Sequence, residues 1–80
     1  MHPITNATQI GATLASRRKH LHLSQTQVAG KLGLSQNRLS ELESRPATLT
    51  VEQLLALLNV LGLEMRIGER TGAKQSKVEW

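Results

Sequence analysis

Hydrogen-bonding side chains are concentrated in a short stretch near the middle of the chain. The stretch contains Ser35, Gln36, Asn37, Arg38 and Ser40. Glutamine and asparagine can each form two hydrogen bonds with an adenine edge, and arginine can reach guanine or a phosphate. A short helix that presents such groups at its N-terminal end fits the major groove of DNA. The stretch therefore predicts contact with the base edges of double-stranded DNA.

Residues suited to catalysis or metal binding do not form a recognisable set. The sequence contains no nucleophile paired with a base, no phosphate-binding loop and no useful pair of carboxylates. His20 and His22 are two positions apart, so they would not share a helix face, and no acidic cluster accompanies them. The chain lacks cysteine, which excludes disulfides and thiolate zinc ligands. We expect no enzymatic activity, no metal and no other cofactor.

The charge distribution points to a polyanionic partner. The 80 residues carry a formal net charge of +4, and the basic residues from Arg17 to Arg38 have no acid among them. Such a region suits DNA because lysine and arginine release phosphate counterions on binding, although a basic surface can also serve solubility alone. Trp80 is the only aromatic residue. Single-stranded nucleic acid is therefore disfavoured, since its binding needs aromatic side chains for base stacking.

Capping residues and apolar spacing predict four helices, over about residues 7–20, 24–33, 35–44 and 50–62. Asn6, Ser24 and Thr50 are each followed three residues later by glutamine, the spacing of a capping box. Gly33 follows the second helix, where a left-handed residue is expected. Pro46 disfavours helix at the residue before it. The apolar residues predicted to pack the second and third helices together are Val28, Ala29, Leu32, Leu34, Leu39 and Leu42.

Residues 8–61 resemble the Cro-type helix-turn-helix of phage repressors, the XRE family. Gln25, Ala29, Gly33, Leu39 and Glu43 carry the resemblance. It implies an all-α bundle of the Cro/lambda-repressor type, in which the helix after Ser35 is the recognition helix. The DNA-contacting set that the resemblance implies is Gln25, Ser35, Gln36, Asn37, Arg38 and Ser40.

Within that set the implied roles differ. Gln36, Asn37 and Ser40 would read bases, and Ser35 and Arg38 would contact a phosphate or a base. Gln25 would contact a phosphate and brace the recognition helix. Arg18 and Glu43 would form a buried ion pair between the first helix and the recognition helix.

Simpler interpretations remain open for several of these positions. Ser35 can serve only as a helix cap, because an N-cap hydroxyl has a structural purpose of its own. Ser40 can be a solvated serine, and Gln25 a helix-start residue. Glu41 is interpreted as a solvated charge rather than a base contact, since phosphates repel a carboxylate and a carboxylate suits mainly the amino group of cytosine. Lys31 and Arg17 fit a DNA-backbone contact and a surface charge equally.

The segment after the fourth helix predicts a strand over residues 63–68. Leu63, Met65 and Ile67 alternate with polar or small residues, which is the period of a half-buried strand. A lone strand needs a partner, and the chain offers no second one. The same strand of a second copy, paired across a two-fold axis, is the economical solution; addition to a different protein and packing on the chain's own helices are the alternatives. The expected homodimer contacts are Leu58, Leu61, Leu63, Met65 and Ile67.

The whole chain resembles HipB-type antitoxins. A domain over residues 1–68 with a leucine-rich last helix and a dimerising strand precedes a polar tail, residues 69–80, that ends in Glu79 and Trp80. The resemblance implies a flexible tail, repression of the chain's own operon at a palindromic operator, and a HipA-like serine/threonine kinase toxin, whole or split, that binds Trp80. Two alternatives are a stand-alone phage-type repressor without a toxin and an adaptor that has lost DNA binding.

The sequence also predicts a cytoplasmic, nucleoid-associated location with no membrane partner. Its start lacks the basic and apolar run of a signal peptide. The longest apolar run, Leu54 to Leu58, is too short to cross a bilayer.

Overall fold

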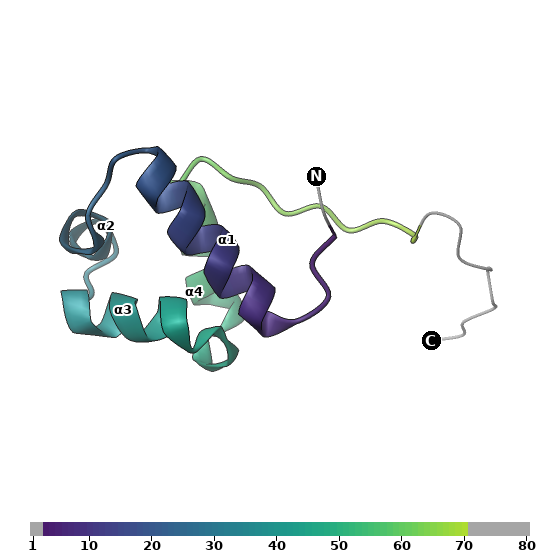
Figure 1. The fold of residues 1–80 in the computed structure, drawn as a ribbon, viewed down its shortest axis with the longest axis horizontal. Helices are drawn as coiled ribbons and strands as arrows, with labels where there is room; N and C mark the ends of the chain where they lie inside the picture. The colour runs from purple at the N-terminus through teal and green to yellow at the C-terminus, as the bar shows by residue number, and fades with distance from the viewer. Residues whose placement is uncertain (1–2, 71–80) are drawn as a thin grey trace.

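The computed structural model describes residues 3–70, and within them the chain forms a small helical bundle (Figure 1). The helices are α1 (Ala7–His20), α2 (Gln25–Lys31), α3 (Gln36–Ser44) and α4 (Val51–Val60), with a short 3-10 turn, η1 (Pro46–Thr48), between α3 and α4. The four predicted helices and the all-helical class are confirmed. The predicted tail from residue 71 onward, Trp80 included, lies outside the described residues.

Each helix begins at a capping residue that the sequence identifies. Asn6, Ser24 and Thr50 form capping boxes with the glutamines three residues later. Ser35 caps α3, and its hydroxyl accepts a hydrogen bond from the Arg38 backbone N–H at 3.1 Å. These caps satisfy N–H groups that the first turn leaves without helical partners. Helix starts are therefore set locally, without help from distant residues.

Three helices end in the same way. After α1, α2 and α4, the backbone N–H of a leucine bonds back to a carbonyl five residues earlier: Leu23 to Arg18 (3.1 Å), Leu34 to Ala29 (2.9 Å) and Leu63 to Leu58 (2.8 Å). This Schellman arrangement places the residue before each leucine in the left-handed region. Gly33 and Gly62 have φ of 70°, whereas the corresponding residue after α1 is His22, with φ of 59°.

His22 therefore occupies a position where glycine carries no steric penalty. We expect His22→Gly to raise the free energy of unfolding by about 0.5–1 kcal/mol. Glycine removes the strain of a Cβ in the left-handed region, and this gain exceeds the cost of the extra entropy that glycine gives the unfolded chain by roughly that amount. Urea denaturation followed by circular dichroism measures the change. Gly33→Ala is the matched control and should be destabilising; a loss of stability in His22→Gly would contradict the argument.

The core joins all four helices. Its buried members are Leu14, Val28, Ala29, Leu39, Leu57 and Leu61. α3 packs against both α1 and α2, and it crosses α1 closely at Gly11, where a Cβ would overlap the backbone oxygen of Glu43 and lie 2.9 Å from Cγ of Pro46. Glycine at this crossing lets the C-terminal half of α3 rest on α1, which brings Glu43 next to Arg18.

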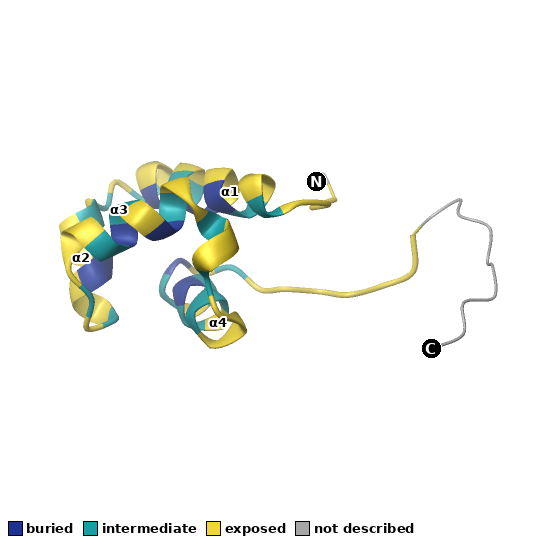
Figure 2. Ribbon diagram, turned by 90° about the horizontal axis from the view of Figure 1, so that it is seen from below, coloured by how far each residue is buried: buried dark blue, intermediate teal, exposed yellow. Residues whose placement is uncertain are grey.

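The C-terminal segment differs from its prediction. Residues 63–70 form neither helix nor strand within the described part of the chain, and they leave the bundle as an exposed arm (Figures 1 and 2). Leu63 is held by the Schellman turn of α4 and packs on the core, so it ends the helix rather than starting a strand. The predicted strand over residues 63–68 is thus not formed in the single chain, where its backbone groups have no neighbouring strand to pair with.

Among the described residues, no helix has both the length and the apolar character that crossing a bilayer requires.

Candidate nucleic-acid interface

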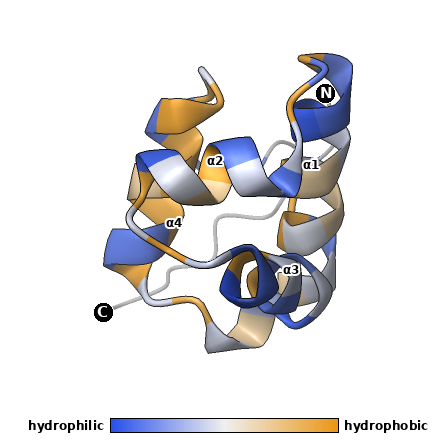
Figure 3. Cartoon of the chain, turned by 90° about the vertical axis from the view of Figure 1, so that its left-hand side faces the viewer, coloured by the Kyte–Doolittle hydropathy of each residue, from blue (hydrophilic) through white to orange (hydrophobic). Residues whose placement is uncertain are grey.

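The exposed side of α3 carries the polar residues of the predicted reading surface. Leu39 and Leu42 are fully buried on one side of the helix. Gln36 and Asn37 are exposed at the N-terminal end, and Ser40 lies one turn further along. Viewed from the α2 side, α3 is mostly hydrophilic whereas α4 is the most apolar helix (Figure 3). The packing of α3 therefore leaves the amides of Gln36 and Asn37 at the surface and Ser40 half-buried.

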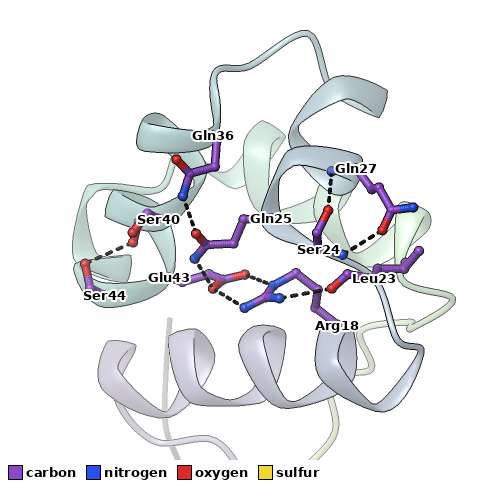
Figure 4. A network of polar contacts seen from close by, with 9 residues as sticks. All are labelled: Arg18, Leu23, Ser24, Gln25, Gln27, Gln36, Ser40, Glu43 and Ser44. Atoms are coloured by element: carbon purple, nitrogen blue, oxygen red, sulfur yellow. Dashed lines mark hydrogen bonds and ion pairs between the residues drawn. The ribbon is translucent and has the colours of Figure 1, made fainter.

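Beneath this surface lies a buried ion pair between α1 and α3 (Figure 4). Arg18 Nε donates to Glu43 Oε2 at 2.7 Å, and Arg18 Nη2 donates to Glu43 Oε1 at 3.1 Å. Arg18 Nη1 also donates to the backbone oxygen of Leu23 at 3.0 Å. The two side chains are only 10% and 9% exposed. The guanidinium thus fixes α1, the turn before α2 and the end of α3 relative to one another.

The ion pair continues outward through two amides. Gln25, the first residue of α2, donates from Nε2 to Glu43 Oε1 at 2.9 Å. Gln36 donates from its Nε2 to Gln25 Oε1 at 2.6 Å. The chain of bonds starts at Arg18 in the core and ends on the recognition helix (Figure 4). The expected bracing of the recognition helix by Gln25 has a direct structural basis in these two bonds.

The direction of these bonds follows from chemistry. A carboxylate only accepts hydrogen bonds, so Gln25 must present its NH₂ group to Glu43 and its oxygen to Gln36. Gln36 must then donate one N–H inward, and it keeps the other N–H and Oε1 for a ligand. One donor beside one acceptor is the pattern that pairs with N7 and the N6 amino group of adenine. The bonds to Gln25 and Glu43 therefore leave Gln36 with one donor and one acceptor side by side, the combination that an adenine edge can pair with.

The other predicted contacts have different surroundings. The Ser35 hydroxyl is engaged as the cap of α3, and the Ser40 carbonyl accepts from the Ser44 hydroxyl at 3.0 Å. Arg38 is bound by Glu41, with 2.7 Å between Nη1 and Oε1. Opposite charges three residues apart in a helix can form such an ion pair. From the sequence Glu41 is interpreted as a solvated charge, so this contact is not predicted.

Arg17 has a role that sequence reasoning did not identify. Its Nε donates to the backbone oxygen of Leu61 at 2.9 Å, across 44 positions of sequence. The guanidinium thus satisfies a carbonyl at the C-terminal end of α4 and ties that end to α1. Arg17 and Arg18 are adjacent in α1, so only the packing of the helices determines that Arg17 caps α4 and that Arg18 pairs with Glu43. Lys31 is exposed.

The predicted dimer contacts differ in how far they are buried in their own chain. Leu61 is 1% exposed and fills the core of its own chain, so it offers no surface to a second copy. Leu58 and Leu63 are partly buried against the same core. Met65 and Ile67 are 47% and 92% exposed on the arm.

Within residues 3–70, histidines and acids form no cluster that could hold a metal ion.

Residues 14–67 match the family model described as helix-turn-helix. Because the match covers more than half of the chain, the protein belongs to the helix-turn-helix family, of the Cro/C1 (XRE) type. Its domain is a DNA-binding regulatory domain and not that of an enzyme family.

A more particular likeness is to the ImmF control region 10 kDa protein of Bacillus phage phi105. The two are 36% identical over 55 residues, which cover 65% of this chain and 61% of that protein. The match therefore spans less than two thirds of the relative's length. No solved structure gives a significant match.

Proposed function

We propose that this protein represses transcription by binding a palindromic DNA operator as a homodimer. The observation that carries the proposal is the outward amide of Gln36, fixed by Gln25 and by the buried pair of Arg18 and Glu43. A preorganised donor and acceptor at the start of a recognition helix suits base-edge recognition, which needs that geometry before binding. The phage relative is a control region protein by name, which is consistent with this role.

A gel-shift assay with the DNA upstream of the gene tests the proposal. We expect a discrete complex that survives competition by random-sequence duplex and weakens steeply as salt rises, because phosphate contacts release counterions. An adaptor that has lost DNA binding would give no specific complex. A reporter gene behind the same DNA should be repressed when the protein is expressed and released when it is absent.

The homodimer in this proposal uses the apolar residues of the arm and the exposed apolar residues of α4. Val51, Leu55, Met65 and Ile67 are exposed large apolar residues. The arm is extended, and its unpaired backbone would be satisfied by an antiparallel copy of itself. The charges on the arm favour a second copy of this chain as its partner. Glu64 and Arg66 lie on either side of Met65 and form an ion pair at 2.7 Å, so two antiparallel copies would bring each charge opposite its complement.

The charges also specify a register. If the two-fold axis passes through Met65, Glu64 of one copy lies opposite Arg66 of the other, and Leu63 lies opposite Ile67. Opposite charges and apolar pairs directly across an antiparallel ladder are each stabilising, and like charges are destabilising. A shift of one residue would lose both the charge pair and the apolar pair.

The cytoplasmic, nucleoid-associated location expected from the sequence follows from the proposed role as a repressor.

We expect Glu64→Arg alone, or Arg66→Glu alone, to weaken the dimer by roughly 2- to 30-fold, from two symmetric pairs worth about 0.2–1 kcal/mol each. The double exchange should restore the wild-type dissociation constant in sedimentation equilibrium. In the same register Met65→Cys should form a disulfide with its own copy on oxidation, whereas Ile67→Cys should not. Equal effects of the single and double exchanges would refute the pairing.

An antitoxin role is the second candidate, and Trp80 favours it. Trp80 is the only aromatic residue and follows a long polar run, and tryptophan is enriched among the residues that dominate protein interfaces. The test is co-purification with a kinase-like protein encoded next to the gene, comparing wild type, Trp80→Ala and a chain truncated after Gly68. Loss of co-purification in both variants supports a HipA-like toxin partner. Retention in both favours a stand-alone repressor.

A further inference from the structure

The recognition helix carries a carboxylate on the side that the proposed function turns toward DNA. Glu41 lies one helical turn beyond Asn37, and residues four apart lie on the same face of a helix. The inner face of α3 is formed by Leu39 and Leu42, which are buried. Glu41 is exposed, so it would enter the major groove together with Asn37.

A carboxylate at this place opposes DNA binding in general. The groove is about 12 Å wide and is bordered by phosphates on both sides, so the negative charge of Glu41 is repelled whatever the sequence. In the free protein this charge is balanced by Arg38, with 2.7 Å between the charged atoms and side chains 36% and 45% exposed. The pair has no net charge, and Arg38 is then less available to bind a phosphate.

We propose that Glu41 is a specificity-determining residue: its carboxylate accepts a hydrogen bond from the N4 amino group of a cytosine beside the base pair that Asn37 contacts, and its ion pair keeps Arg38 from binding phosphates indiscriminately. The proposal rests on the proposed function, since it requires α3 to lie in the major groove.

Cytosine is the base that this group selects. Its major-groove edge offers an amino donor, whereas guanine offers only acceptors, which a carboxylate repels. Thymine has an acceptor and a methyl group, and adenine places the N7 acceptor beside its amino group. On an operator with cytosine in reach, the charge of Glu41 is therefore satisfied. On other DNA it remains a penalty, and the difference becomes sequence discrimination.

The experiment is selection from a pool of randomised duplexes by wild type, Glu41→Gln and Glu69→Gln. The Glu69 variant loses the same charge from an exposed position beyond α3, so it is the matched control. Wild type and control should enrich a C·G pair at one position of each half-site, where Glu41→Gln should lose the preference or change it toward A·T. Replacing that cytosine in the selected site should weaken wild type by about 5- to 150-fold and Glu41→Gln by less than twofold.

The salt dependence gives an independent measurement on random-sequence duplex. Release of Arg38 in Glu41→Gln should increase affinity for this DNA, and it should steepen the slope of log affinity against log salt by about 0.9 for each arginine that gains a phosphate. Identical selected motifs and identical slopes for wild type and Glu41→Gln would overturn the proposal. If wild type itself enriched no sequence, the proposed function would fail instead, so the two failures are distinguishable.

Discussion

Replacing Arg18 with leucine is expected to lower the free energy of unfolding by about 3–5 kcal/mol, because it leaves the carboxylate of Glu43 buried without its countercharge. Both side chains are about nine-tenths covered. Small domains have total stabilities of roughly 5–15 kcal/mol, so such a loss would remove a large share of the total. Thermal and urea denaturation, followed by circular dichroism, measure the change.

Two further variants isolate the cause. Arg66→Leu removes an arginine from an exposed ion pair with Glu64, and such pairs contribute at most about 1 kcal/mol. The double variant Arg18→Leu/Glu43→Leu removes both charges, so it should be more stable than Arg18→Leu alone. A double variant no more stable than Arg18→Leu alone would mean that packing, and not the unpaired charge, is responsible.

Gln36→Ala is expected to weaken operator binding by about 5- to 150-fold per half-site, which is the usual worth of a bidentate amide–adenine contact. Because glutamine carries no charge, binding to random-sequence duplex should change little. Fluorescence anisotropy with both duplexes measures the ratio of the two affinities. The operator would lose its preference for A·T at the position that Gln36 reads.

Gln25→Ala provides the companion measurement. It removes the partner that orients the amide of Gln36 without removing that amide. We expect a smaller loss of operator affinity than for Gln36→Ala, together with a broadened base preference at the same position. Unchanged preference in both variants would remove Gln36 from the reading set, even if other residues of α3 still bound the operator.

The helices and their starts were predictable because their determinants are local. A capping residue fixes each start, with a glutamine three positions later in α1, α2 and α4, and a left-handed residue with a following leucine fixes three of the ends. The contact of Arg18 with Glu43 was predicted only through the family resemblance, because the two residues are far apart in the sequence. The contact of Arg17 with Leu61 was not predictable, since two adjacent arginines in one helix have no local difference that assigns them different partners.

The C-terminal segment shows what a sequence period leaves undecided. Alternating residues from Leu63 to Ile67 satisfied the period of a strand, but a strand also needs a neighbour, and in a single chain Leu63 is recruited into the end of α4 instead. Leu61 was expected at the dimer interface but lies in the core of its own chain. An apolar residue near the end of a helix can face its own core or a partner, and the helical period alone does not distinguish the two.

The chain of bonds from Glu43 to Gln36 limits how this protein can acquire a new binding preference. Each amide in the chain points in a direction fixed by the carboxylate beneath it, so a reading residue at position 36 must donate a bond inward. Gln36→Glu would set an acceptor against the oxygen of Gln25, and it would require a second change at position 25 to a residue that donates both to position 36 and to Glu43. We therefore expect altered specificity at this base pair to evolve, or to be engineered, through paired rather than single substitutions.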